Sequence, residues 1–338
     1  MNIHLRPSVR SRFCAATILA IVPAAMSTFA TPTANAGITR HEVHASRQQA
    51  SASPSSKTVW FVVRDAAGKL VTQLTKQDFQ IFEDGKPRQI TTFLTPQKVS
   101  TPLTLGLLLQ FSGQRHDTVP YGELNSAASF FRTAINGRSE GFVATFASRV
   151  HPLGSITSDP GELQRDVRLA KGEDLRGSSS LYDAVVWACQ KRMSPGPGIR
   201  NVLVIVSDGH DNSSRRTSKD AVKAAVRSGT QVYFLDLAYA DPYFAPGLRD
   251  ELNREVEKFV GATGGSLIFV HREKQFEQAF RMISAQLNHE YALGFRLAER
   301  ECDGHLHRIE IRSADSHLRA FGPGQVYATK DCATTSGP

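Results

Sequence analysis

The sequence predicts an α/β fold built on a doubly wound, mostly parallel sheet, with a small β module formed from the N- and C-terminal segments. Two observations lead to this fold class. Between residues 102 and 288, apolar runs of strand length alternate with segments of helical spacing. Strand-like groups flank this region at 59–93 and 290–328, and each is too small to bury a core alone. We therefore expect the two flanking groups to pair with each other.

The α/β region predicts its elements in alternation. The strands expected are 103–109, 141–147, 202–206, 231–237 and 266–270. The helices expected are 122–135, 160–170, 180–192, 218–227, 248–263 and 273–288. Alternating strands and helices favour a parallel sheet that is covered on both faces and connected by right-handed crossovers.

The flanking segments show shorter strand signals. Before the α/β region these are 59–64, 79–82 and 89–93, separated by glycine-containing turns. After it they are 290–296, 305–312 and 325–328. The expected organisation is therefore an N-terminal β segment at 58–100, the α/β domain at 101–289, and a C-terminal β segment and tail at 290–338.

The N-terminal residues have the pattern of an export signal. Three arginines precede a mostly apolar stretch at 13–26, and Ala34-Asn35-Ala36 has the small-x-small spacing of a cleavage site. The apolar stretch is shorter than the ~20 residues that span a bilayer. We expect residues 1–36 to be a signal peptide, 37–57 to be a flexible linker, and the mature chain to be periplasmic or secreted without a membrane span.

Charge and cysteine content bear on the partners and the compartment. The 338-residue chain has 40 Lys+Arg and 32 Asp+Glu, and removal of the predicted signal peptide leaves 37 basic residues, or +5. These are scattered, without the basic run expected of a nucleic-acid-binding arm. Cys189 lies among apolar helical residues and is expected to be a buried thiol. Cys302 and Cys332 lie in the polar C-terminal region, where an oxidising compartment favours a Cys302–Cys332 disulfide.

Polar loops follow two of the buried strands, and a third opens a helix. They read Gln110-Phe-Ser112-Gly-Gln114, Ser207-Asp208-Gly-His210-Asp, and Gly-Ser-Ser179-Ser-Leu-Tyr-Asp. Upstream, residues 63–85 read Val-x-Asp-x-x-Gly-x-x-Val-x-x-Leu-Thr-x-x-Asp-Phe-x-x-x-Glu-Asp-Gly. Over about 59–295 this order of motifs resembles the von Willebrand factor A domain, and more narrowly a secreted bacterial subfamily with that N-terminal segment. The resemblance implies a Rossmann-like fold in which strand 141–147 is an antiparallel edge.

The resemblance also implies a metal-ion-dependent adhesion site, which this sequence only partly retains. The family's first loop has Asp-x-Ser-x-Ser, its second loop a Thr and its third an Asp. Here those positions hold Gln110, Ser112 and Gln114, then Ser179, then Asp208. A hard cation binds oxygen ligands mainly through charge, so loss of the first carboxylate predicts a degenerate site. We expect no tightly bound cofactor, with weak Mg²⁺ binding at Ser112, Ser179 and Asp208 as the alternative.

These features predict a non-enzymatic, adhesion-type module that binds a protein partner, through an acidic side chain where a metal remains. The partner-binding residues expected are Gln110, Ser112, Gln114, Ser179, Asp208 and His210. A hydrolase built on Ser112 or Ser207 with His210 is the second hypothesis, but the loop lacks the Gly-x-Ser-x-Gly spacing of a nucleophile elbow. The third is an envelope assembly component that binds through the β module, with Tyr243 and Phe244 as candidate contacts.

Overall fold

The computed structural model describes residues 56–99, 101–111, 121–170, 178–193, 198–237, 246–270, 272, 274–298 and 302–330. All of them belong to one compact unit, residues 49–338. The predicted signal peptide and almost all of the predicted linker lie outside the described residues. Within the described part, no helix has the length and apolar character needed to cross a membrane.

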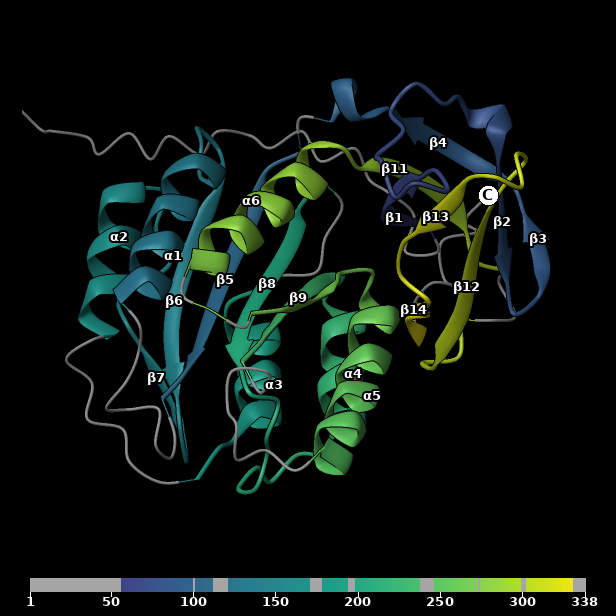
Figure 1. The fold of residues 1–338 in the computed structure, drawn as a ribbon. Helices are drawn as coiled ribbons and strands as arrows, with labels where there is room; N and C mark the ends of the chain where they lie inside the picture. Colours follow the sequence, from purple (N-terminus) through teal and green to yellow (C-terminus); the bar gives the residue numbers. More distant parts are fainter. Residues whose placement is uncertain are drawn as a thin grey trace, which may run out of the picture. The chain divides into compact units, whose positions relative to one another are not determined.

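A six-stranded sheet forms the centre of the α/β domain, in the order β10-β9-β8-β5-β6-β7 (Figure 1). Its strands are β5 (Leu103–Gln110), β6 (Glu140–Phe146), β7 (Val150–Pro152), β8 (Arg200–Ser207), β9 (Thr230–Asp236) and β10 (Leu267–Phe269). All neighbouring pairs are parallel except β6 and β7. β5 and β8 are buried along their whole length because helices cover both faces of the sheet.

Six described helices cover the sheet: α1 (Tyr121–Ala134), α2 (Pro160–Leu169), α3 (Leu181–Lys191), α4 (Ser218–Arg227), α5 (Pro246–Thr263) and α6 (Lys274–Asn288). One core cluster joins α1, α2 and α6 to side chains such as Leu107 and Val204. A second joins α3, α4 and α5 to side chains such as Leu108 and Ile205. Alternate residues of each strand therefore face opposite helix layers, which confirms the predicted doubly wound architecture.

The expectation that strand 141–147 is an antiparallel edge is wrong. β6 pairs in parallel with β5, with Leu105 opposite Gly141. The 14 residues of α1 are long enough to carry the chain back across the sheet between two parallel strands. The antiparallel edge is the short β7, which follows β6 after a tight turn and pairs with its last three residues. β7 has only three residues, 150–152, and so short a segment does not predict a strand from sequence.

The β module is a sandwich of two four-stranded sheets, ordered β13-β1-β11-β4 and β14-β12-β2-β3. From the N-terminal segment come β1 (Ser56–Arg64), β2 (Phe79–Glu83), β3 (Lys86–Arg88) and β4 (Ile90–Leu94), with short 3₁₀ turns at Lys76–Asp78 and Pro96–Lys98. From the C-terminal segment come β11 (Tyr291–Arg296), β12 (Leu306–Ser313), β13 (Arg319–Phe321) and β14 (Gln325–Tyr327). β11 lies between β1 and β4, and β12 pairs with β2. The predicted pairing of the two terminal segments is confirmed.

Aromatic side chains fill the centre of this sandwich. The Tyr291 ring stacks on Phe61 at a centroid distance of 5.4 Å, and Phe79 packs edge-on against Phe61 at 5.1 Å. The Tyr291 hydroxyl donates to the carbonyl of Val71 at 3.0 Å and accepts from the amide of Leu74 at 3.1 Å. A buried tyrosine hydroxyl needs such partners, so this one residue of β11 also fixes the irregular segment between β1 and β2.

Cys302 is disulfide-bonded, and Cys189 is a buried free thiol whose pKa burial raises to about 11. The sequence prediction of a buried thiol at Cys189 is therefore confirmed. The partner of Cys302 lies outside the described residues, as does Cys332, so the Cys302–Cys332 pairing stays a prediction.

A buried ion pair joins the α/β domain to the β module. Arg200, the first residue of β8, pairs with Glu290, which immediately precedes β11. The Glu290 carboxylate also accepts from Gln231 at 2.9 Å and from the Tyr233 hydroxyl at 3.2 Å. The Arg200 guanidinium further donates to the Leu287 carbonyl at 3.0 Å.

Arg200 and Glu290 are both buried, so each charge needs the other for compensation. Arg200 and Glu290 are 6% and 1% exposed, and the guanidinium lies over the Trp60 ring of β1 at 5.2 Å. Burial raises the pKa of Glu290, although Arg200 and the hydrogen bonds from Gln231 and Tyr233 act in the opposite direction. Removal of either charge would therefore leave the other buried without compensation.

Glu290→Gln is expected to lower the free energy of unfolding by about 3–5 kcal/mol, because it leaves the Arg200 charge buried and unpaired. Chemical denaturation followed by circular dichroism measures this change. The matched control is Glu277→Gln, which removes an exposed pair with Arg281 on α6 and should change stability by less than about 1 kcal/mol. Equal effects of the two substitutions would contradict the assigned role of the buried pair.

His307 of β12 is the centre of an acidic cluster in the β module. Its Nδ1 lies 2.7 Å from the Asp84 carboxylate and 3.6 Å from Glu83, and its Nε2 lies 3.2 Å from Asp303. Burial lowers the pKa of His307, but the hydrogen bonds to Asp303 and Asp84 and the charges of both carboxylates outweigh it and raise the pKa above 6.5. The imidazolium therefore holds the β2–β3 turn against the loop that precedes β12.

The stabilisation from His307 should depend on pH. Because its folded-state pKa is raised, the contribution is complete below the unfolded-state pKa of about 6.5 and is lost as pH rises through the folded-state value. The stability difference between wild type and His307→Gln should therefore shrink as pH rises above about 6.5. Thermal unfolding across this range measures it, with exposed His317→Gln as control. A difference that is constant or grows with pH would refute the raised pKa.

Candidate functional site

The predicted first and third loops meet at the carboxyl edge of the sheet, where β5 and β8 end side by side. Gln110 is 1% exposed, and its Oε1 accepts hydrogen bonds from the Ser207 hydroxyl at 2.5 Å and the Asp208 amide at 3.0 Å. The Ser207 hydroxyl in turn accepts from the Gly209 amide at 3.0 Å. The amide side chain at position 110 thus organises the start of the third loop.

The second loop is joined to the third through backbone groups. The Ser179 amide donates to Asn212 Oδ1 at 2.8 Å, and its carbonyl accepts from the amides of Asn212 and Ser213, each at 3.0 Å. Next to it, the amide and the hydroxyl of Ser180 both donate to the Ala147 carbonyl at 2.7 Å. We call the surface formed by Gln110, 178–180 and 207–216 the rim.

Carboxylates hold the rim together by accepting from backbone amides. Asp208 Oδ1 accepts from the His210 amide at 2.8 Å. Asp211 accepts from the Tyr182 amide at 2.9 Å and from the Ser214 hydroxyl at 2.6 Å. Because charge-assisted bonds of this kind are short and strong, these aspartates fix the shape of the rim.

Asp183, in the first turn of α3, fixes the far end of the same loop. Its two carboxylate oxygens accept from the amides of Arg215 and Arg216 at 3.1 and 3.0 Å. A carboxylate in the first turn also interacts favourably with the positive end of the helix dipole. The consequence is that two consecutive arginine backbones are held in place while both side chains are exposed.

Two buried polar atoms of the rim lack a hydrogen bond, Ser179 Oγ and Ser213 Oγ. The Ser179 side chain is 3% exposed, and its Oγ is buried without a hydrogen bond. Burial of an unpaired hydroxyl is unfavourable by roughly 1–3 kcal/mol.

The remaining described donors do not fit a tightly bound divalent cation. Gln110 carries no charge, and its Oε1 already accepts two hydrogen bonds. One oxygen of Asp208 accepts from His210. Among the residues that the structure describes, no group of three His, Cys, Asp or Glu side chains gathers in a way that could hold a metal ion. Hard cations require several charged oxygen ligands, and of the predicted ligand positions that the structure describes, Gln110, Ser179 and Asp208, only Asp208 carries a carboxylate.

The structure therefore brings together four of the predicted site residues: Gln110, Ser179, Asp208 and His210. Ser112 and Gln114 lie outside the described residues, as do Tyr243 and Phe244. The sequence analysis considered Ser207 only as a hydrolase nucleophile and did not single out Asn212, and the structure shows that both connect the loops. Two features of the sequence could have indicated these roles: a serine at the end of a buried strand, and an asparagine that follows an Asp-Gly turn.

The hydrolase hypothesis gains no support from Ser207. Its side chain is fully buried, and its hydroxyl donates to Gln110. A nucleophilic serine must instead be exposed to substrate and hydrogen-bonded to a general base. The hydroxyl therefore positions the loop.

Comparison with known proteins gives fold-level similarity alone. No family model matches the chain, and no curated protein matches it. Among solved structures, it is similar to a von Willebrand factor type A protein from Catenulispora acidiphila (TM-score 0.44, 11% identity, 84% of this chain and 76% of that chain). An aerotolerance-related membrane protein from Bacteroides fragilis matches with TM-score 0.41 and 16% identity over 55% of this chain and 98% of that one.

A third similarity is to proximal thread matrix protein 1 from the mussel byssus, with TM-score 0.46 and 11% identity over 57% of this chain and 47% of that chain. Identities and scores this low do not assign an activity or a partner. The functional argument for this chain therefore rests on its own residues.

The donor set predicts that Mg²⁺ and Mn²⁺ do not bind the wild-type protein at micromolar concentration, because the first-loop carboxylate is replaced by Gln110. Gln110→Asp restores that charge and should strengthen binding at least tenfold. Isothermal titration calorimetry measures both. Micromolar binding to the wild type that Asp208→Ala abolishes would show that the rim still holds a cation.

Proposed function

We propose that this chain is an exported, non-enzymatic module that binds a protein partner at the rim, an adhesion-type role with a degenerate metal site. The proposal rests on the hydrogen bonds that the carboxylates in and beside the rim accept. Asp183, Asp208 and Asp211 accept from backbone amides of the same surface. They build a fixed surface instead of presenting a reactive group.

A fixed surface favours binding because little conformational freedom remains to be lost on association. The rim joins three segments that are distant in the sequence, at residues 110, 178–180 and 207–216, through the hydrogen bonds described above. These properties support recognition more directly than catalysis.

Two exposed arginines of the rim favour an acidic partner. Arg215 and Arg216 are exposed, and their backbones are anchored by Asp183. Paired arginine side chains recognise carboxylates through several parallel donors. In a domain whose cation site has lost a carboxylate, these guanidinium groups can supply the positive charge that attracts a partner's Glu or Asp.

Export is part of the proposal. The predicted signal peptide lies outside the described residues, but Cys302 is disulfide-bonded. Disulfides persist in oxidising compartments such as the periplasm and the extracellular space. The bond is therefore consistent with a mature protein that functions outside the cytoplasm.

The β module offers an alternative binding surface. The exposed hydrophobic side chains of the described residues include Leu94 of β4 and Phe321 of β13, which are 38% and 47% exposed. Both strands lie at the edges of one sheet, where unpaired backbone groups accept further strands. An assembly component would use one of these two edges, and it would not depend on the rim.

Partner capture from envelope extract separates the two surfaces. Arg215→Gln with Arg216→Gln should weaken capture at least tenfold in binding titrations, since both charges face the proposed acidic partner. The control is Arg132→Gln with Arg168→Gln, which removes the same charge from exposed positions on α1 and α2.

EDTA should leave capture unchanged if the rim acts without a metal. Loss of capture after Leu94→Ser with Phe321→Ser, together with full capture by the rim variant, would assign binding to the β module instead.

A further inference from the structure

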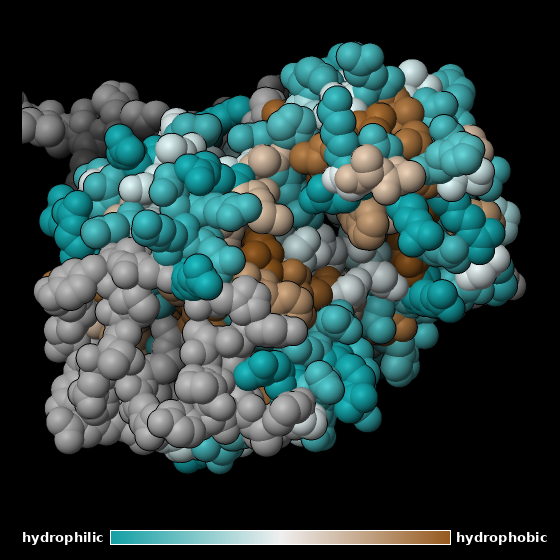
Figure 2. Space-filling view, in the orientation of Figure 1, coloured by the Kyte–Doolittle hydropathy of each residue, from teal (hydrophilic) through white to brown (hydrophobic). Residues whose placement is uncertain are grey.

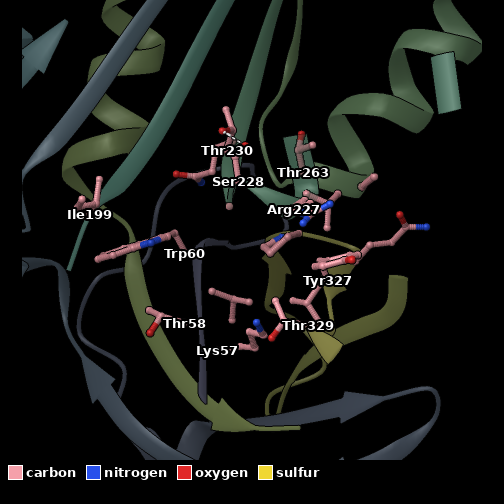
Figure 3. A pocket seen from close by; sticks show the side chains of 18 of the residues that line it. Lys57, Thr58, Trp60, Ile199, Arg227, Ser228, Thr230, Thr263, Tyr327 and Thr329 are labelled. Carbon is pink, nitrogen blue, oxygen red and sulfur yellow. Dashed lines mark hydrogen bonds between the residues drawn. The ribbon is translucent and has the colours of Figure 1, made fainter. Parts of the chain in front are cut away.

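A cavity lies at the end of the sheet opposite the rim. It lies between the amino ends of β8 and β9 and the β module (Figure 3). It has a volume of about 540 Å³, within the roughly 300–1,000 Å³ typical of small-molecule sites. Its walls come from the start of β1, the end of α4, the end of α5 and the strand β14. We call it the basal cleft, and it shares no lining residue with the rim.

The polar lining of the basal cleft is basic. Lys57 and Arg227 line it, and no Asp or Glu is among the described residues that do. Hydroxyl groups surround them: Figure 3 shows Thr58 and Thr329 with Lys57, and Ser228 and Thr230 on the opposite wall. Two cations without a neighbouring acid produce a positive potential, which a cleft with low-dielectric walls focuses.

The charge on Lys57 is uncompensated within the protein. No ion pair or hydrogen bond to its ammonium group occurs in the described part of the chain. Burial lowers its pKa, and no acidic group opposes that effect. A partly buried ammonium group of this kind gains an opposite charge at little further desolvation cost when an anion binds.

Arg227 is held in a geometry that leaves its donors available. The guanidinium lies over the Tyr327 ring of β14 at 5.1 Å, an arrangement that fixes the plane while the N–H groups point outward around its edge. The carbonyls at the end of α4 are bonded to Ser228 and Gly229. These bonds reduce the negative potential that the C-terminus of α4 places at this wall.

Apolar groups complete the cleft. Val59, Ile199, Val226, Ala262 and Val326 line it together with Trp60. Trp60 is fixed from behind by Arg200, which the buried pair with Glu290 holds in place. The cleft thus combines a rigid apolar wall with two cations. A ligand that fits it would place an apolar group against the wall and an anionic group beside the cations.

We propose that the basal cleft binds a small organic anion, with a carboxylate or phosphate group held by Lys57 and Arg227 and an apolar body against Trp60 and Ile199. The site is independent of the rim and of any protein partner. It also requires both halves of the β module, because residues of β1 and of β14 line the same cavity.

The probes are benzoate and phenyl phosphate, which share the apolar ring and differ in the anionic group. Trp60 lines the cleft and the chain has one other tryptophan, Trp187, so fluorescence in a Trp187→Phe background reports binding, with calorimetry as the second measurement. At least one probe should bind saturably at millimolar concentration or below. The stronger of the two identifies the anionic group. Benzylamine, which carries the opposite charge, should not bind.

Lys57→Gln should weaken binding of the better probe roughly tenfold or more, because it removes a charge-assisted contact. The substitution removes a partly buried, unpaired charge, so folding should be retained, and Arg227→Gln serves as a second variant. Exposed Lys69→Gln is the control for net charge. The proposal fails if neither probe saturates, if benzylamine binds equally, or if Lys69→Gln weakens binding as much as Lys57→Gln. Equally tight binding of inorganic phosphate would overturn the role of the apolar wall.

Discussion

The buried ion pair between Arg200 and Glu290 is the constraint on which the arrangement of the two halves depends. Arg200 begins the central strand β8, and Glu290 lies where α6 passes into β11. The pair therefore fixes the point at which the chain leaves the α/β domain and re-enters the β module. Gln231, Tyr233 and Leu287 satisfy the remaining polar atoms, as a buried pair requires if it is not to destabilise the fold. Trp60 then packs on the guanidinium and connects the N-terminal strand to the same network.

The rim uses charge in a different way. Its aspartates accept from amides within the same surface, so each carboxylate contributes to shape before it contributes to recognition. Gln110 extends this principle, because its neutral oxygen bridges Ser207 and Asp208 where a cation would need a free carboxylate. A carboxylate at that position would repel Asp208 unless a cation lay between them. The amide avoids this repulsion, so Gln110 and Asp208 can lie side by side at the ends of β5 and β8.

Patterns of apolar residues predicted most of the fold, because β5, β8 and β9 are buried along their whole length and the helices between them have regular apolar faces. The pairing of the terminal segments followed from their small size. The short strands β3, β7 and β13 have three residues each and depend on a neighbouring strand for their conformation, so local sequence carried little signal for them. The direction of β6 was mistaken because it was taken from the family resemblance and not from the length of the α1 crossover.

The candidate site was predictable in position but not in chemistry. The strand ends placed Gln110 and Asp208 together, since adjacent parallel strands end at the same edge. The hydrogen bonds of Ser207, Asn212 and Asp183 could not be read from the sequence, because each connects residues about 30 or more positions apart. Arg200 and Glu290, 90 positions apart, were missed for the same reason. Long-range polar pairs leave no periodic pattern, in contrast to apolar faces.

The position of the basal cleft follows from the chain path. An α/β domain normally presents its ligand site at the carboxyl ends of its strands, and here the rim occupies that edge. The chain enters β5 and leaves α6 at the other edge, where its two terminal segments close into one sandwich. That closure brings β1 and β14 against the amino ends of β8 and β9 and creates a cavity between them. Arg227 and Lys57 come from opposite modules, so neither module alone can form the basic site, and the insertion of one module into the other creates it.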